Sequence, residues 1–245
     1  MKAILTYHSV DETGSVISID ERSFRRHVAW LASSAVRVVP LDRLLDVSPN
    51  EDAIAITFDD GLESFGSVAA PLLLEHGLPV TLFVVTDAVG ATNVWSAGGD
   101  ADIPVARILG WDELGRLAEA GVTLGAHTCS HPRLEFLSAM EAEREITDSR
   151  SHLERELGLS VTSFAYPYGS VGATARDVVA RAFRYGVTTR LAALASTDDP
   201  ALLPRLDTYY FRAPGTLESW GSRRFRMRMG LLAGARSLRR TLVRR

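Results

Sequence analysis

Two short apolar runs each end in side chains that can take part in metal chemistry. The sequence AIAITFDDG ends in Asp59 and Asp60, and GVTLGAHTCSHP carries His127 and His131 four residues apart. Three ligands, Asp60 and the two histidines, would leave a divalent ion open to water and substrate, as in catalytic rather than structural sites. Because such an ion lowers the pKa of water from ~15.7 to ~7, Asp59 can take the proton of an attacking water. The pattern predicts metal-assisted hydrolysis.

Each motif alone has a simpler interpretation. Asp-Asp-Gly is a common turn, and two histidines at this spacing can be a coincidence. Their positions favour a shared site, because both follow strand-like runs and active sites form at the carboxyl ends of parallel strands. Neighbouring strand residues point to opposite faces, so Asp59 and Asp60 can share a pocket only where the strand stops at Gly61.

The elements that must position these residues alternate along the chain. We expect extended segments over Lys2–Tyr7, Val36–Val39, Ala53–Phe58, Val80–Val85, Val122–Ala126, Val161–Ala165, Tyr185–Thr188 and Leu202–Tyr210. We expect helices after an N-cap at Asp20 or Ser23 and over Leu41–Leu45, Ser67–His76, Trp111–Ala120, Ser138–Gly158 and Ala173–Phe183. This alternation predicts right-handed βαβ units in an α/β fold with a parallel sheet, open or closed.

Composition indicates a soluble protein in a reducing compartment. The 245 residues are 46% hydrophobic and 23% charged, enough for one large α/β domain or two small ones. The single cysteine, Cys129, excludes an intrachain disulfide, which fits a reducing compartment, although secreted bacterial proteins without disulfides also exist. The residue itself is interpreted as small and buried. The N-terminal sequence MKAILTYHSV has too short an apolar run for a signal peptide, and no run of 18 apolar residues follows. We therefore expect a cytoplasmic location, with a peripheral position on the inner membrane face as the alternative.

The last 27 residues differ from the rest of the chain in charge. They contain nine arginines and no acidic residue, which leaves residues 1–218 with a net charge of −12. Within Phe225–Val243 an apolar stripe recurs at helical spacing: Met227, Leu231, Ala235, Leu238 and Leu242. We divide the chain into a domain over 1–215 and an amphipathic tail over 216–245. Such a helix can lie on an anionic membrane, dock on the acidic body or fray, and no nucleic-acid module is present.

Three motifs resemble those of a known family. The sequences TFDDG at 57–61, HTCSHP at 127–132 and YPYG at 166–169 are similar to the first three motifs of the polysaccharide deacetylases. This is the NodB-homology group, carbohydrate esterase family 4, and the match in order and spacing runs from about Lys2 to Tyr210. The resemblance implies a single distorted (β/α) barrel with an incomplete strand count. It also implies removal of N-acetyl or O-acetyl groups from sugars with zinc or a similar divalent ion.

The resemblance also assigns roles to residues. It implies that Asp59 is the base and that Asp60, His127 and His131 are the metal ligands. The backbone N–H of Tyr168, which follows Pro167 in the third motif, would stabilise the oxyanion, a contribution of ~3 kcal/mol. Among the aromatic residues, Trp95 in the long loop before Gly110 is the candidate for stacking on a sugar.

Two positions depart from the family pattern. An arginine usually stands two residues before the proline of the third motif, and this chain has Ala165 there. Arg205, in LLPRLD, is a candidate for the missing cation beside Asp59, although an arginine on a late strand is also commonly part of a structural ion pair. The family's late histidine, its general acid, is absent, since no histidine follows His152.

A permuted subgroup offers a replacement for that acid. In proteins resembling the poly-N-acetylglucosamine deacetylases, the strand that bears the acid comes first in the sequence. LTYHSV at 5–10 fits this order, so His8 is the candidate that protonates the leaving amine. The alternative is a histidine that only hydrogen-bonds a loop.

These observations leave three functions open. The leading hypothesis is a metal-dependent hydrolase, with Zn²⁺ as the favoured ion, that removes the N-acetyl group from an N-acetylhexosamine unit. The substrate would be a glycan or glycolipid precursor, which a membrane-bound tail would suit. The alternatives are an amidohydrolase acting on a non-sugar amide and a catalytically silent carbohydrate-binding protein.

Overall fold

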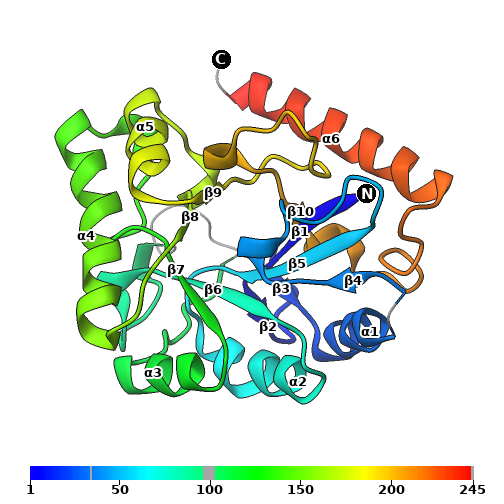
Figure 1. Cartoon of the computed structure of the whole chain (residues 1–245), viewed down its shortest axis with the longest axis horizontal. Helices are drawn as coiled ribbons and strands as arrows, with labels where there is room; N and C mark the ends of the chain where they lie inside the picture. The colour runs from blue at the N-terminus through cyan, green and yellow to red at the C-terminus, as the bar shows by residue number, and fades with distance from the viewer. Residues whose placement is uncertain (34, 96–102, 244–245) are drawn as a thin grey trace.

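A parallel sheet forms the centre of the protein (Figure 1). The computed structural model describes residues 1–33, 35–95 and 103–243, with side chains to residue 235. Its strands are β1 Lys2–Tyr7, β4 Arg37–Val38, β5 Ala53–Phe58, β6 Val80–Val84, β7 Thr123–Ala126, β8 Ser163–Ala165, β9 Tyr185–Val187 and β10 Leu206–Asp207. Two further strands, β2 Ser9–Val10 and β3 Ser18–Ile19, pair with each other.

The sheet curls into an incomplete barrel. The strand order is β10-β1-β5-β6-β7-β8-β9, with β4 paired to the first residues of β5. One segment reaches both edges of this sheet, because Leu203 forms a bridge with Val187 of β9 and Leu206 pairs with Leu5 of β1. The predicted distorted (β/α) barrel is therefore confirmed.

Helices cover the outside of the sheet. They are α1 Glu21–Ala32, α2 Ala70–Glu75, α3 Trp111–Glu119, α4 Ala139–Leu157, α5 Ala173–Ala182 and α6 Arg223–Val243. Helices α1 to α5 follow one another around the sheet, and α6 lies across the remaining side, near the N-terminus (Figure 1). Of the two candidate caps for α1, Asp20 is confirmed, since its carboxylate accepts a hydrogen bond from the Ser23 N–H at 2.8 Å. None of the helices within the described ranges has the length and apolarity that a membrane crossing requires.

Aromatic packing fixes the ends of the two central strands. Tyr7 of β1 stacks on Phe58 of β5 with ring centroids 4.9 Å apart, and Phe24 of α1 meets both rings edge-on. All three side chains are buried, and each contributes about 1.5–3 kcal/mol on leaving water. This packing holds the ends of β1 and β5 in place, and with them the residues that follow Tyr7 and Phe58.

Two predicted elements differ from the structure. The segment Leu202–Tyr210 is not one extended piece, because Pro204 cannot donate a ladder hydrogen bond and the Asp207 carboxylate accepts from the Tyr209 N–H and starts a 3₁₀ turn. The helix predicted from Ser67 begins instead as a π-helical turn over Phe65–Ala69. Wide turns of this kind are frequent beside functional sites.

Candidate active site

A cavity of about 700 Å³ opens where β1, β5, β7 and β8 end. Every candidate residue except one lines it: His8, Asp59, Asp60, Trp95, His127, His131, Tyr168 and Arg205. The exception, Pro167, is buried in the turn that carries Tyr168. The barrel therefore brings together residues that are up to 197 positions apart in the chain.

Asp60, His127 and His131 converge on one point. The Asp60 Oδ1 atom lies 3.4 Å from Nε2 of His127 and 3.4 Å from Nε2 of His131. All three side chains are buried. The rings of Trp95 and Tyr168 flank His131 at centroid distances of 4.8 and 4.7 Å and fix its orientation by packing.

The donor atoms of this cluster fit a divalent cation. The Nδ1 atom of His127 lies 2.7 Å from the Ala165 carbonyl, which can only accept, so Nδ1 carries the proton and a neutral ring has a lone pair on Nε2. Burial lowers the pKa of His131 to about 3, so its ring is neutral. Burial also opposes protonation of His127, but the carboxylates of Asp60 and Asp59 outweigh it and raise the pKa of that histidine, so an ion at its Nε2 atom would displace a proton. Asp60 Oδ1 is buried, and no hydrogen-bond donor of the described residues reaches it. A carboxylate oxygen facing the Nε2 atoms of two imidazoles matches a zinc-type ligand set.

An unusual backbone conformation makes this convergence possible. Asp60, Thr128, His131 and Tyr168 are the non-glycine residues with positive φ in the described chain, at 73°, 67°, 63° and 57°. For Asp60 this left-handed conformation directly after β5 turns the side chain toward the pocket that Asp59 also faces. Such conformations cost of order 1–3 kcal/mol and persist where surrounding contacts enforce them, commonly at functional sites.

Arg205 holds Asp59 in its charged form. Its Nη1 and Nη2 atoms donate to the two Asp59 oxygens at 2.7 and 2.6 Å, and its Nε donates to the Thr188 carbonyl at 3.0 Å. Both side chains are almost fully buried. Burial opposes ionisation of Asp59, but the Arg205 guanidinium outweighs it and holds the pKa of the carboxyl below its usual range. The structure thus places the candidate cation against the candidate base.

His8 lies on the other side of Asp59. It follows β1 directly, and its Nε2 atom is 3.7 Å from Asp59 Oδ2. Its side chain is 23% exposed, so it faces the open part of the cavity. A group in this position can reach both a bound substrate and solvent.

Several residues of the cavity were not predicted from the sequence. Arg133 lies over the ring of Tyr168, 4.2 Å from its centroid. Asp207, at the end of β10, and Tyr209, in the turn that follows, form another part of the wall. Leu232 of α6 also lines the cavity. Of these residues, only Arg133 could have been suggested from the sequence, because it directly follows the HTCSHP motif.

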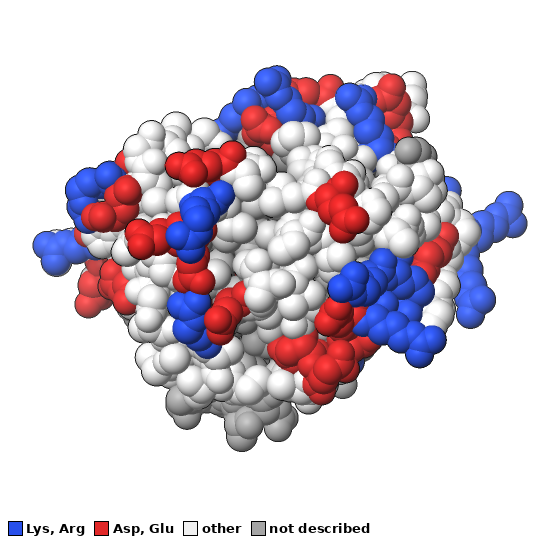
Figure 2. Space-filling view, turned by 90° about the horizontal axis from the view of Figure 1, so that it is seen from below, with Lys and Arg blue, Asp and Glu red and all other residues white. Residues whose placement is uncertain are grey.

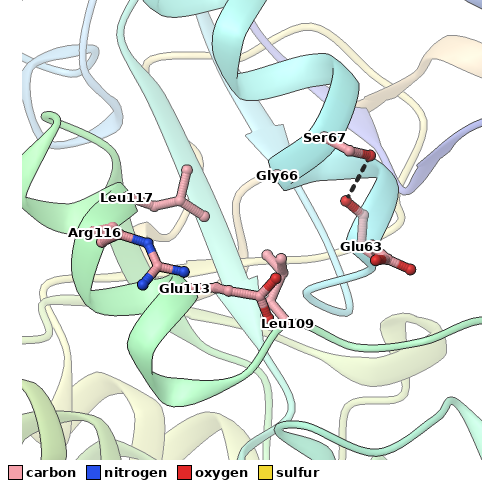
Figure 3. Close-up of a pocket in the computed structure, with 7 residues that line it drawn as sticks. All are labelled: Glu63, Gly66, Ser67, Leu109, Glu113, Arg116 and Leu117. Carbon is pink, nitrogen blue, oxygen red and sulfur yellow. Dashed lines mark hydrogen bonds between the residues drawn. The ribbon is translucent and has the colours of Figure 1, made fainter.

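A second hollow, of about 270 Å³, lies between the π-helical turn and α3 (Figure 3). Its acids, Glu63 and Glu113, both pair with Arg107. Its remaining lining is Gly66, Ser67, Leu109, Arg116 and Leu117. With its carboxylates engaged and no histidine or cysteine in its lining, this hollow has no ligand set comparable to that of the larger cavity.

Comparisons with known proteins agree with this geometry. The sequence model of the family described as polysaccharide deacetylase matches residues 46–187. Bacillus subtilis YxkH, whose name assigns it provisionally to the polysaccharide deacetylases, is 26% identical over 201 residues, which are 80% of this chain and 66% of that protein. A poly-beta-1,6-N-acetyl-D-glucosamine N-deacetylase of Staphylococcus aureus (strain N315) is 23% identical over 203 residues, 77% of this chain and 67% of that one. The chain thus spans about two thirds of the length of these relatives.

Solved structures share the fold. IcaB from Ammonifex degensii superimposes with a TM-score of 0.71 at 22% identity, covering 89% of this chain and 93% of that one. The Streptococcus pyogenes deacetylase PplD, solved in complex with acetate, gives a TM-score of 0.70 at 22% identity over 84% and 91% of the two chains.

Proposed function

The chain belongs to the polysaccharide deacetylase family, and on that premise we propose that it is a metal-dependent hydrolase that removes N-acetyl groups from an N-acetylhexosamine. The favoured unit is N-acetylglucosamine in a glycan or glycolipid precursor. The observation that carries this proposal is the buried Asp60 oxygen between two imidazole nitrogens, which no hydrogen-bond donor in the described part of the chain reaches, beside the ionised carboxylate of Asp59.

The residues divide the work of amide hydrolysis between them. A divalent ion such as zinc, held by Asp60, His127 and His131, would polarise the amide carbonyl and acidify a water molecule. Asp59 accepts a proton from the attacking water, and Arg205 fixes the orientation of that carboxylate. The Tyr168 N–H donates to the developing oxyanion, and His8 protonates the departing amine, so that one water and one amide yield acetate and the free amino sugar.

Two features favour a sugar amide over the alternatives. The aromatic ring of Trp95 lines the cavity beside the ligand cluster and offers a flat apolar surface to a sugar ring. A catalytically silent binding protein would not need a buried, ion-paired carboxylate beside three converging metal ligands.

Acetate release tests the proposal. The zinc-loaded protein is expected to release acetate from N-acetylglucosamine oligomers, to lose this activity after chelation and to regain it with added zinc. Hydrolysis of small cyclic amides in place of the oligomers would support the non-sugar alternative. Binding of the oligomers without any acetate release would support the silent protein.

We also propose that α6 contacts an anionic membrane surface. One face of this helix packs on the body, through the buried Phe225, which stacks on Phe211, and the partly buried Met229. Two members of the predicted apolar stripe, Met227 and Leu231, are on another face and are 66% and 72% exposed, whereas a third member, Ala235, lines the cavity. Leu238 and Leu242 of that stripe lie outside the described side chains.

The positive charge of α6 indicates that its exposed face contacts anionic lipid. The described arginines of the helix, which are all exposed, are Arg223, Arg224, Arg226 and Arg228. The face of the molecule seen in Figure 2 instead shows basic and acidic groups next to each other, without an extended region of one sign. Apolar side chains among arginines are the combination that binds the headgroup region of anionic bilayers. Because Leu232 of the same helix lines the cavity, such contact would bring the site close to a lipid-linked sugar.

Vesicle sedimentation tests the membrane contact. Replacing both Met227 and Leu231 with serine is expected to reduce binding to vesicles that contain phosphatidylglycerol, because the apolar contact is lost while every arginine remains. Met140→Ser, which changes an exposed methionine of α4, is the matched control and should bind like the wild type. Equal binding by all three proteins would contradict the proposal.

A further inference from the structure

A second group of side chains with potential ligand atoms for a metal lies outside the lining of the candidate active site. The donor atoms of Asp87, Cys129 and His152 all lie within 4.8 Å of one another. Cys129 stands between His127 and His131 in the sequence, but it does not line the catalytic cavity. We propose that these three residues form a separate site for a thiophilic divalent cation such as zinc or cadmium.

Backbone hydrogen bonds hold the supporting segments together. Asp87 lies in the turn after β6, and its N–H donates to the Cys129 carbonyl at 2.9 Å. The neighbouring Thr86 N–H donates to the Thr128 carbonyl at 3.2 Å, and the Cys129 N–H donates to Glu145 of α4 at 2.9 Å. His152 stands two turns further along the same helix. Three elements far apart in the chain are therefore fixed at the places from which the ligands project.

The distances require only a small adjustment to bind an ion. His152 Nδ1 lies 3.8 Å from Asp87 Oδ1 and 3.3 Å from the Thr86 hydroxyl. Tetrahedral zinc, with bonds of about 2.0–2.3 Å, places neighbouring ligand atoms about 3.5 Å apart. Cys129 is buried and fixed, whereas the side chains of Asp87 and His152 are 55% and 31% exposed. These two can rotate inward without disturbing the core, with water or Thr86 as the fourth ligand.

The donor set selects the kind of ion. A thiolate and an imidazole favour zinc, cadmium or cobalt over magnesium and calcium, which prefer oxygen ligands. Binding replaces the thiol proton with the metal, so one Cys129 S–H bond is exchanged for one sulfur–metal bond and a proton is released. No electron transfer is involved. The site does not depend on the proposed hydrolysis.

Cobalt spectroscopy tests the second site directly. Cobalt(II) bound to thiolate shows a sulfur-to-metal charge-transfer absorption that a site of only histidine and carboxylate lacks. Because Cys129 is the single cysteine, this band can come from no other residue of the chain. Titration of the metal-free full-length protein with CoCl₂ is expected to bind two equivalents, one of which produces the band.

Variants separate the two sites. Cys129→Ser and His152→Ala should each lose the band and one equivalent, whereas Asp60→Ala should lose one equivalent and keep the band. His76→Ala, at an exposed histidine, is the matched control and should keep both equivalents. A wild-type protein that binds cobalt without the band, or a band that His152→Ala leaves unchanged, would overturn the proposal. Loss of both equivalents in Asp60→Ala with no band would also contradict it.

Discussion

Replacement of Asp59 with asparagine is expected to lower turnover about 10²–10⁴-fold, the usual contribution of a general base. Asparagine keeps the shape of the side chain and can still accept a hydrogen bond from Arg205, but it cannot accept the proton of the attacking water. The three metal ligands are unchanged, so bound zinc should stay at the wild-type level. Acetate release and metal content measured on the same preparation check both expectations.

A variant of the candidate acid, His8, can be compared with Asp59→Asn. His8→Ala should also keep its metal and lose most turnover on N-acetyl substrates, whose amine must be protonated as it leaves. Its loss should be much smaller on an activated acetyl ester, whose leaving group needs no proton, whereas Asp59→Asn should be slow on both. Near-normal amide hydrolysis by either variant would remove that residue from the mechanism.

Arg205→Met is expected to destabilise the fold by about 3–5 kcal/mol at pH 7, because it leaves the buried Asp59 carboxylate without its partner. In the wild type, the pKa of Asp59 is lower in the folded state than its value of ~3.9 in the unfolded state, so the charged carboxylate stabilises the fold at pH values above ~3.9. This contribution is lost as the pH falls through the lower pKa of the folded state. In the variant, burial without Arg205 favours the neutral acid. The difference in unfolding free energy between the two proteins should therefore shrink as the pH falls toward 4, as measured by urea denaturation.

The double variant Asp59→Asn/Arg205→Met is the control for this prediction. Removal of both charges should recover part of the stability, since breaking a buried pair costs more than replacing it. A double variant less stable than Arg205→Met would show that Arg205 acts mainly through other contacts, such as that with the Thr188 carbonyl.

The central strands could be predicted from the sequence because they are buried on both faces. Lys2–Tyr7 and Ala53–Phe58 are apolar runs with clear ends, and the structure has both strands at the predicted bounds. The candidate ligands could be named for the same reason, since they directly follow such runs. Arg205 could only be suggested, because its contact with Asp59 depends on how the barrel closes.

Other features depend on contacts that no local pattern encodes. The left-handed backbone of Asp60 has no sequence signature beyond Gly61, and the bridge through Leu203 is a single pairing. The apolar stripe through Met227 was visible in the sequence, but which face of α6 packs on the body was not. The cluster around Cys129 was missed because its members come from three separate elements.

A crystal structure of the zinc-loaded protein is the most direct test of the account. It should contain an ion bound by Asp60 and by the Nε2 atoms of His127 and His131 at about 2.0–2.2 Å, with Asp59 beside it and still paired to Arg205. An Asp60 carboxylate satisfied by a protein donor, with these three residues binding no ion in excess zinc, would contradict the central claim.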